Sequence, residues 1–207
     1  MAAGVTYPYD SLVIATGGTV FIPPVEGKDL DNVFVVRTVR DGKNIQKALE
    51  GSTNVVIGGA GVIGLELAVA LRDMGKDVTI IEMMDQVIPR IADKDMADMI
   101  QQELEAKGIK FVMKAPIQAV KGDGKVEFVT AAGEDYPCDV MIFATGVRAN
   151  LDIPKMLGLD IGQLNAVIAA PTMNAYRRGR LVPDIFVAGD LVQCLSLIHI
   201  SEPTRPE

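Results

Sequence analysis

Short apolar runs alternate with longer helical patterns along most of this chain of 207 residues. The clearest alternation begins with the β-branched run Asn54–Ile57, which predicts a buried strand. A helix is predicted over Val62–Met74, and Gly75 stands where a glycine commonly ends a helix. A second strand is predicted over Val78–Ile81. Strand, helix and strand in this order predict a βαβ unit with parallel strands.

Similar patterns predict further elements on both sides of the βαβ unit. Thr38 and Asp41 have the spacing of a capping box, which predicts a helix from there to about Leu49. Another helix is predicted over Lys94–Ala106, with Asp93 as its cap. Its helically spaced apolar residues are expected to face the core: Met96, Met99, Ile100 and Leu104. Further strands are expected over Leu12–Ala15, Val33–Val36, Ile109–Met113, Asp139–Gly146 and Val182–Asp190.

Glycine and proline mark the connections. Ile117–Val120 and Lys125–Thr130 flank the turn Gly122–Gly124, which predicts a hairpin, and a second hairpin turn is expected near Gly133. Phe21–Gly27 contains two prolines and is predicted to be an extended crossover. The three arginines in Tyr176–Leu181 favour a solvated loop, with a phosphate contact as the alternative.

Three glycines occupy the turn between the first strand and the helix of the βαβ unit. Gly59, Gly61 and Gly64 have the G-x-G-x-x-G spacing. In such a turn the first glycine allows the tight bend, the second leaves room for a pyrophosphate, and the third lets the helix lie close to the strand. The helix then directs its free N–H groups at the phosphate. With a strand before it and a helix after it, this turn predicts a dinucleotide site rather than a plain tight turn.

Glu82 ends the second strand, eighteen residues after Gly64. A carboxylate at this place accepts hydrogen bonds from the hydroxyls of the adenosine ribose and disfavours a 2′-phosphate. No arginine follows directly, since the next residues are Met83, Met84 and Asp85. The sequence therefore predicts NADH rather than NADPH.

Composition narrows the class of protein. Hydrophobic residues make up 49% of the chain, and the formal net charge is −7. The negative charge disfavours a nucleic-acid partner and an anionic membrane surface. No apolar run approaches the roughly 20 residues of a membrane span, and the N-terminus lacks the pattern of a signal peptide. We therefore expect a cytoplasmic protein with no nucleic-acid partner and no membrane.

Cysteine and histidine provide no predicted catalytic or metal site. Cys138 has no partner cysteine or base near it in sequence, which favours a small buried residue over a redox thiol. The segment Leu195–Glu207 differs in character from the rest and holds His199, the one histidine. Leu195–Arg205 resembles the translated end of a transposase adapter used in preparing DNA for sequencing, against the alternative of an ordinary disordered C-terminus. We therefore predict no role for His199.

Five motifs, taken in order, give the chain a family resemblance. They are Ala15–Gly17, Gly58–Glu66, Val78–Glu82, Ala144–Asn150 and Asp184–Asp190. Together they resemble the FAD-dependent pyridine nucleotide-disulfide oxidoreductases, most closely the branch of NADH oxidases and coenzyme A-disulfide reductases. The resemblance implies an α/β fold. A Rossmann-like NAD(P)-binding domain with a parallel sheet and a β-hairpin meander would be inserted in a partial FAD-binding domain.

The resemblance also implies a domain organisation. Residues 1–22 would end a first FAD-domain segment, 23–150 would form the NAD(H)-binding domain, 151–194 would return to the FAD domain, and 195–207 would be the adapter-like segment. The family's first glycine fingerprint, its redox cysteines and its dimerisation domain would lie outside this chain. We therefore expect an N-terminally truncated piece of a homodimeric parent, which by itself is inactive and binds NADH weakly.

The same resemblance implies roles for individual residues. Asp190 would bind the ribityl chain of FAD, with Gly189 making room, and the flavin nucleotide would be lined by Ala15, Thr16 and Gly17. Glu82 would bind the adenosine ribose of NADH and Gly146 its nicotinamide half. The residues that would cradle NADH are Gly59, Gly61, Val62, Ile63 and Gly64. Glu66 would lie near the nicotinamide or flavin, with a helix-surface charge as the alternative.

The implied function is hydride transfer from NADH to FAD and on to a disulfide, oxygen or another acceptor. A single-cofactor NAD dehydrogenase is one alternative, but outside the tail the chain has no histidine and no Tyr-x-x-x-Lys pair to transfer a proton. Such an enzyme would also leave Gly189 and Asp190 unexplained. An NADH-sensing or interaction protein is the non-enzymatic alternative. Retention of flavin separates these hypotheses.

Overall fold

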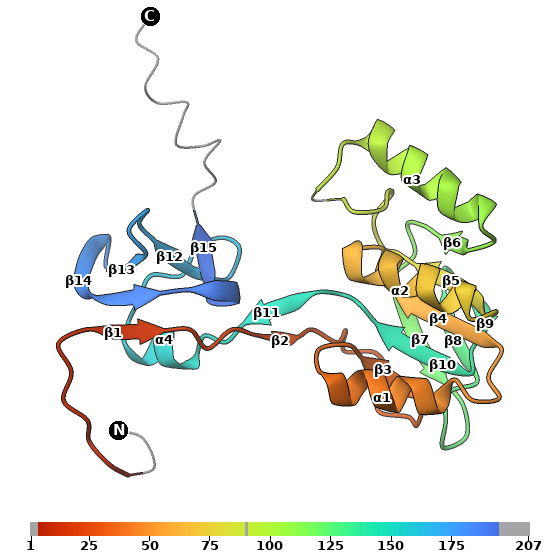
Figure 1. The fold of residues 1–207 in the computed structure, drawn as a ribbon, viewed down its shortest axis with the longest axis horizontal. Helices are drawn as coiled ribbons and strands as arrows, with labels where there is room; N and C mark the ends of the chain where they lie inside the picture. The colour runs from red at the N-terminus through yellow and green to blue at the C-terminus, as the bar shows by residue number, and fades with distance from the viewer. Residues whose placement is uncertain (1–3, 90, 195–207) are drawn as a thin grey trace, which may run out of the picture. The chain divides into compact units, whose positions relative to one another are not determined.

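The computed structural model describes residues 4–89 and 91–194, which fold as two compact units (Figure 1). Unit 1 combines the chain up to Thr19 with the chain from Val147 onward, and unit 2 comprises Val20–Gly146. Both units contain helix and sheet, so the predicted α/β class is confirmed. None of the described helices is long and apolar enough to cross a membrane.

A five-stranded parallel sheet forms the centre of unit 2. Its strands, in spatial order, are β3 (Val33–Val35), β10 (Val140–Phe143), β4 (Asn54–Gly58), β5 (Asp77–Ile81) and β6 (Lys110–Val112). The chain proceeds outward from β4 to β5 and β6, whereas β10 lies on the other side of β4. The direction of winding therefore reverses between β4 and β10, which is the switch point where open α/β sheets bind ligands.

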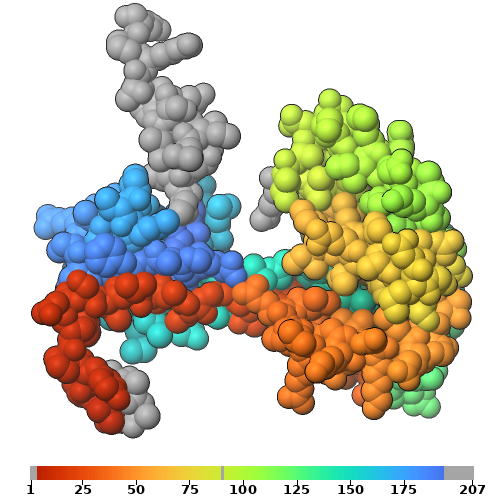
Figure 2. Space-filling view, in the orientation of Figure 1, coloured from red at the N-terminus to blue at the C-terminus, as the bar shows by residue number. Residues whose placement is uncertain are grey.

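Alternate residues of the central strands pack into two different cores. Val55 and Ile57 of β4 face the three helices α1 (Val39–Ala48), α2 (Val62–Asp73) and α3 (Lys94–Ala106). Those helices form the surface of unit 2 that faces the viewer in Figure 2. Val56, between the two, faces an antiparallel sheet of β7 (Ile117–Lys121), β8 (Phe128–Ala131) and β9 (Glu134–Pro137). A strand buried on both faces reads as a continuous apolar run, which is why β4 was recognisable in the sequence.

The predicted hairpins form, with one displaced boundary. β8 pairs antiparallel with both β7 and β9, as the two glycine turns predicted. However, β8 begins at Phe128 rather than at Lys125. Lys125 instead forms a bridge with Asp31, and the amide of Val126 donates to the Asp31 carbonyl at 3.0 Å. Because Lys125 and Val126 pair with Asp31, which is distant in sequence, they are not part of β8.

The start of α1 and the end of α2 both follow sequence rules. Thr38 and Asp41 form the predicted capping box: the Asp41 amide donates to Thr38 Oγ1 at 3.2 Å and the Thr38 amide to Asp41 Oδ2 at 2.7 Å. After α2, Gly75 adopts a φ of 79°. Its amide donates to the carbonyl of Arg72, and that of Lys76 to the carbonyl of Leu71. These two bonds form a Schellman motif, which confirms Gly75 as the residue that ends the helix.

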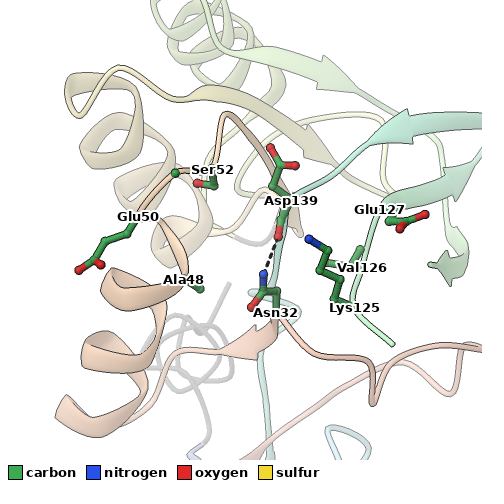
Figure 3. Close-up of a pocket in the computed structure, with 9 residues that line it drawn as sticks. Asn32, Ala48, Glu50, Ser52, Lys125, Val126, Glu127 and Asp139 are labelled. Carbon is green, nitrogen blue, oxygen red and sulfur yellow. Dashed lines mark hydrogen bonds between the residues drawn. The ribbon is translucent and has the colours of Figure 1, made fainter. Parts of the chain in front are cut away.

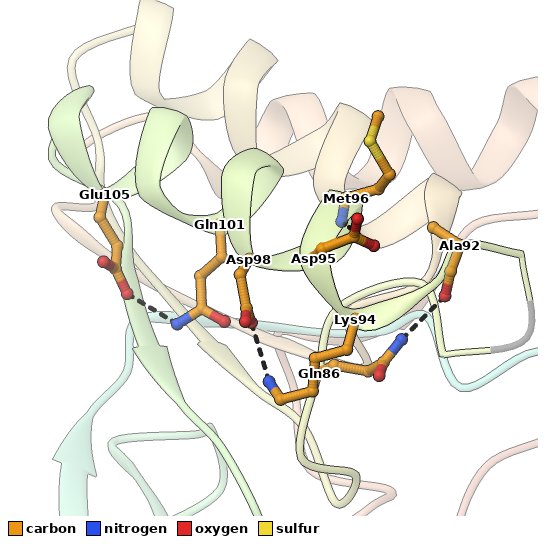
Figure 4. Close-up of polar contacts among 8 residues, drawn as sticks. All are labelled: Gln86, Ala92, Lys94, Asp95, Met96, Asp98, Gln101 and Glu105. Atoms are coloured by element: carbon orange, nitrogen blue, oxygen red, sulfur yellow. Dashed lines mark hydrogen bonds and ion pairs between the residues drawn. The ribbon is translucent and has the colours of Figure 1, made fainter.

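One expectation about α3 is wrong, and another is confirmed only in part. Met96 and Met99 are 52% and 64% exposed, whereas Ala97 and Leu104 are buried. The small side chain of Ala97 allows the helix to pack its Ala97 and Leu104 side against the core. Met96 and Met99 therefore lie on the solvent-exposed part of the helix. Asp93 occupies the N-cap, but within the described residues its side chain makes no capping bond. The Met96 amide that it would cap donates to Asp95 Oδ1 instead, as Figure 4 shows.

Unit 1 contains a five-stranded mixed sheet. In spatial order its strands are β1 (Leu12–Ile14), β14 (Arg180–Val187), β13 (Asn174–Arg177), β12 (Val167–Ala169) and β15 (Val192–Cys194). A short helix, α4 (Asp152–Met156), and a 3-10 turn, η1 (Gly189–Leu191), complete the unit. The core includes Ile14, Val187 and Leu191.

The arginine-rich segment Tyr176–Leu181 is a hairpin and not the predicted loop. β13 and β14 pair antiparallel on either side of a turn at Arg178 and Gly179, whose φ angles are 52° and 71°. Asp160 stabilises this turn by accepting the amides of Arg178 at 2.8 Å and Gly179 at 2.7 Å. The charged arginines favoured a loop in the sequence, whereas their backbone forms a strand pair. The turn of that pair is stabilised by Asp160, a carboxylate distant in sequence.

Two short strands that were not predicted from the sequence lie where the chain leaves one unit for the other along the sequence. β2 (Gly18–Val20) pairs with β11 (Val147–Ala149). Gly18 lies so close to this partner that an added Cβ would be 2.9 Å from the Arg148 carbonyl oxygen. The adapter-like segment Leu195–Glu207, with His199, lies outside the described residues.

Asp139 should make the stability of unit 2 acid-sensitive. Its Oδ2 accepts the amides of Asn54 at 2.7 Å and Thr53 at 2.9 Å, and the bond from Asn54 holds the pKa of this carboxyl below its usual value. The stabilisation is therefore present above the unfolded pKa of about 3.9 and is lost as pH falls through the lower folded value. We predict that Asp139→Asn lowers the unfolding free energy at pH 7 by about 1–3 kcal/mol. Urea unfolding at pH 7 and pH 3 should show a smaller deficit at pH 3; an equal deficit would contradict this account.

The two sides of α3 should tolerate substitution differently. We predict that Met99→Gln changes the unfolding free energy by no more than about 0.5 kcal/mol, because the side chain is mostly in water. Leu104→Ala, on the buried side of the same helix, should cost about 2–5 kcal/mol. Urea denaturation of both variants provides the measurement. Similar losses in the two would show that Met99 packs in the core after all.

Candidate functional site

The glycine turn lies at the switch point between β4 and β10. Gly59 directly follows β4 and has a φ of 107°, a conformation that other residues rarely adopt. A Cβ on Gly59 would lie 2.7 Å from the carbonyl oxygen of Ala144, the residue after β10. The Ala144 amide in turn donates to the carbonyl of Gly58 at 2.8 Å. Glycine at position 59 therefore lets the ends of the two strands approach each other.

Gly64 is tightly packed, whereas Gly61 has open space beside it. An added Cβ on Gly64 would lie 2.1 Å from the Gly59 carbonyl oxygen, so only hydrogen fits between α2 and the turn. A Cβ on Gly61 would meet nothing within 4 Å in the described part of the chain. Gly61 is the N-cap of α2, and a helix has no internal acceptors for the N–H groups of its first turn. Open space in front of these donors suits an anionic group such as a diphosphate.

Glu82 lies directly against the glycine turn. The residue is only 7% exposed. Oε2 accepts the backbone amide of Ala60 at 2.7 Å, and Oε1 accepts that of Met84 at 2.8 Å. The structure thus brings the three glycines and the acid together at one edge of the sheet, as their spacing predicted. A carboxylate at this place also fits the hydroxyls of a ribose.

The remaining residues predicted for NADH surround the same turn. Val62 and Ile63, in the first turn of α2, are 44% and 52% exposed. Gly146 follows β10 two residues after Ala144 and has a φ of 91°. Glu66 lies exposed one turn further along α2. Its place near the helix start is compatible both with a role at the nicotinamide and with a simple surface charge.

In unit 1, two motifs far apart in sequence meet at one sheet edge. β1 and β14 are parallel neighbours, with Ile14 opposite Val187. Ala15, Thr16 and Gly17 follow β1, while Gly189 and Asp190 follow β14 across the one residue Ala188, whose amide donates to the Ile14 carbonyl at 3.1 Å. Gly17 and Gly189 both have positive φ, at 63° and 75°. The predicted flavin residues therefore lie at the carboxyl ends of adjacent strands, where α/β sheets bind ligands.

Asn150 holds one of these motifs, and no role was predicted for it. Its Nδ2 donates to the Thr16 carbonyl at 2.9 Å, and its Oδ1 accepts the Thr19 hydroxyl at 2.7 Å. The Asn150 amide donates to the Gly17 carbonyl at 3.0 Å. A hydrogen-bonding side chain after the Ala-Thr-Gly of residues 144–146 was visible in the sequence. Its partners, more than 130 residues away, were not.

Cys138 is a packing residue, as predicted. It is 1% exposed, and burial raises the pKa of its thiol to about 12. Since the thiolate is the reactive form, burial of this thiol disfavours a redox or nucleophilic role. Among the described residues, no group of three or more histidine, cysteine and acidic side chains could hold a metal ion.

A cavity of about 280 Å³ lies at the opposite edge of the sheet (Figure 3). Asn32, Ser52 and Asp139 line it, and they precede β3, β4 and β10. Asn32 Nδ2 donates to the Asp139 carbonyl at 3.2 Å, and the Asp139 carboxylate binds backbone amides. Ligands of such sheets bind at the carboxyl ends of the strands, so we assign the functional site to the glycine turn and not to this cavity.

The winding of the sheet, the tight glycine turn and the acid against it define a dinucleotide-binding domain of the Rossmann type. The family model described as pyridine nucleotide-disulphide oxidoreductase matches residues 2–204. The chain belongs to this family, which confirms the resemblance carried by its motifs.

Individual relatives agree with this assignment. A protein named NADH oxidase from Methanocaldococcus jannaschii is 43% identical over 200 residues, which cover 96% of this chain and 43% of that protein. An NAD(P)H coenzyme A polysulfide/persulfide reductase from Pyrococcus horikoshii is 31% identical over 93% of this chain and 42% of its own length. The structure of an NAD-dependent persulfide reductase from A. fulgidus matches 89% of this chain and 34% of its own, with a TM-score of 0.82 at 34% identity. The chain thus spans less than half the length of these relatives.

The glycine turn provides a matched pair of substitutions. Gly64→Ala should force α2 away from the turn and lower the unfolding free energy by about 1–3 kcal/mol. Gly61→Ala should cost less, up to about 1 kcal/mol, because its Cβ has open space although alanine is a poorer N-cap than glycine. The methyl group of Gly61→Ala would occupy the space for a diphosphate. We therefore expect this variant to bind NADH at least tenfold more weakly, a loss of about 1.4 kcal/mol in binding free energy.

Urea unfolding and calorimetric titration of the two glycine variants separate these effects. Gly61→Ala should retain most of its stability and lose affinity, while Gly64→Ala should lose both. Unchanged NADH affinity in stable Gly61→Ala would place the diphosphate elsewhere.

Proposed function

We propose that this chain is part of a flavoprotein oxidoreductase that transfers hydride from NADH to FAD and passes the electrons on to a disulfide, oxygen or a related acceptor. The observation that carries the proposal is that two sheet edges in one chain each have small residues and turns typical of a nucleotide-binding site. One is the glycine turn of unit 2 with Glu82. The other is the meeting of Ala15–Gly17 with Gly189–Asp190 at the ends of β1 and β14.

In this proposal, residues 23–150 form the NAD(H)-binding domain, and residues 1–22 and 151–194 belong to the FAD-binding domain. The NADH site comprises Gly59, Gly61, Val62, Ile63, Gly64, Glu66, Glu82 and Gly146. The FAD site within this chain comprises Ala15, Thr16, Gly17, Gly189 and Asp190. The residues that choose the acceptor are not among them.

Each group at the NADH site has a defined task. The first-turn N–H groups of α2 bind the diphosphate, which the open space at Gly61 admits. Glu82 accepts the ribose hydroxyls and disfavours a 2′-phosphate, which sets the preference for NADH. The nicotinamide supplies a hydride and the flavin accepts it, while the protein binds and orients both.

The names of two relatives support the range of acceptors. The relative from Methanocaldococcus jannaschii is named an NADH oxidase, and the one from Pyrococcus horikoshii is named an NAD(P)H coenzyme A polysulfide/persulfide reductase. We extend both possibilities to the protein of which this chain is a part. A cytoplasmic location accompanies the proposal, since a reduced dinucleotide pool and a free thiol at Cys138 suit a reducing compartment. The homodimeric assembly is what the family resemblance implies for the parent protein.

The competing hypotheses explain less of the structure. A single-cofactor dehydrogenase needs one nucleotide site and leaves the junction of Ala15–Gly17 with Gly189–Asp190 without a task. An NADH sensor would account for both edges only if it also bound flavin. The proposal therefore depends on whether FAD is retained.

Flavin content and its reduction test the whole protein. We predict that the enzyme containing this chain purifies with an absorbance band of oxidised flavin, which NADH bleaches under anaerobic conditions. NADPH at the same concentration should bleach it at least tenfold more slowly, because Glu82 meets the 2′-phosphate. A protein that binds NADH but carries no flavin would be a sensor or a single-cofactor enzyme. Absence of both ligands would refute the proposal.

A further inference from the structure

The carboxylate of Glu82 is already engaged by the protein itself. Oε2 holds the amide of Ala60 at 2.7 Å, and Oε1 holds the amide of Met84 at 2.8 Å. Ala60 is the middle residue of the turn Gly59–Gly61 and is fully buried. Hydrogen bonds to an ionised carboxylate are about twice as strong as neutral ones, and here they are protected from water. Glu82 thus binds the backbone of the glycine turn in the absence of nucleotide.

The backbone of Glu82 is itself held on both sides. Its amide donates to the Val112 carbonyl at 2.9 Å, and its carbonyl accepts the Ala115 amide at 2.9 Å. The turn has two further attachments: the Gly59 amide donates to the Ile81 carbonyl, and the Ile88 amide donates to the Ala60 carbonyl, both at 2.8 Å. Ala60 is therefore bonded through both its N–H and its C=O. Glu82 joins the turn to a strand end that cannot shift easily.

A turn built on glycines needs such attachments. Glycine loses more conformational freedom on ordering than any other residue, so a free turn at Gly59 and Gly61 would sample many shapes. Ordering it at the moment of binding would weaken the affinity for nucleotide. A turn already held in the binding shape avoids that loss.

We propose that Glu82 is a positioning residue that latches the glycine turn in the cofactor-free protein, besides binding the adenosine ribose. This inference rests on the proposed NADH site and adds a second task to one of its residues. Each carboxylate oxygen can accept more than one hydrogen bond, so ribose hydroxyls can bind while Ala60 and Met84 stay attached. Because the Ala60 amide is directed to Glu82, the diphosphate is bound by the amides that follow, from Gly61 onward.

The latch and ribose recognition differ in what they predict for a ligand without ribose hydroxyls. The probe is an NADH analogue whose adenosine ribose lacks the 2′- and 3′-hydroxyl groups. If Glu82 only recognises those hydroxyls, Glu82→Gln leaves the affinity for the analogue unchanged. It could even raise that affinity, because a negative charge near the diphosphate is removed. If Glu82 latches the turn, Glu82→Gln lowers it, because a glutamine amide cannot accept both backbone amides.

The experiment compares the enzyme that contains this chain with its Glu82→Gln variant by calorimetry and by amide hydrogen exchange. We expect Glu82→Gln to bind the analogue at least fivefold more weakly, and the Ala60 and Met84 amides of the nucleotide-free variant to exchange at least tenfold faster. Analogue affinity equal to or above that of the unmodified enzyme would overturn the latch.

Asp139→Asn is the matched control. Asp139 also accepts two backbone amides in unit 2, but at the opposite edge of the sheet. This variant should lose stability without changing the analogue affinity or the exchange of the Ala60 amide. An equal change in both variants would show that general destabilisation, and not the latch, affects the turn.

One measurement needs no variant. In the folded, nucleotide-free enzyme, the Ala60 amide should exchange as slowly as the amides of β4; fast exchange there would overturn the latch even if Glu82→Gln failed to fold. If the enzyme that contains this chain binds neither NADH nor the analogue, the proposed nucleotide site is wrong. Slow exchange at Ala60 that Glu82→Gln abolishes would still establish the latch itself.

Discussion

The close approach of α2 to the end of β4 is the constraint on which the nucleotide-type site depends. Only a hydrogen atom fits where Gly64 meets the Gly59 carbonyl, and only a glycine at position 59 fits beside the Ala144 carbonyl. These two contacts bring the helix start to the switch point of the sheet. Any side chain at either position would move the helix, and its N–H groups would no longer face the space in front of Gly61.

The carboxyl ends of parallel strands organise both units in the same way. In unit 2 the turn after β4 lies beside the turn after β10, and in unit 1 the residues after β1 lie beside those after β14. A parallel pair brings the residues that follow its two strands to one edge, however far apart they are in sequence. Each unit therefore presents small, backbone-exposing residues at the edge where such sheets bind ligands.

Two carboxylates at opposite edges of the unit 2 sheet show how position changes the consequence of one interaction. Asp139 and Glu82 each accept two backbone amides. At the amino edge, Asp139 fixes the start of β4 and serves stability. At the carboxyl edge, Glu82 fixes a turn that faces open space. The same hydrogen bonds thus contribute to folding at one edge and, in our proposal, to nucleotide binding at the other.

Local patterns in the sequence were sufficient for the βαβ unit, the capping box at Thr38, the glycine that ends α2 and the meander of β7 to β9, because neighbouring residues determine those conformations. The grouping of Gly59, Gly61, Gly64 and Glu82 was equally predictable, since one short crossover connects them. Only the tertiary structure decided that Met96 and Met99 face solvent, that the arginine segment is a hairpin held by Asp160, and that Asn150 holds Thr16 and Thr19. Each of these depends on a partner remote in sequence, and no periodicity within a segment records which partner folding will bring to it.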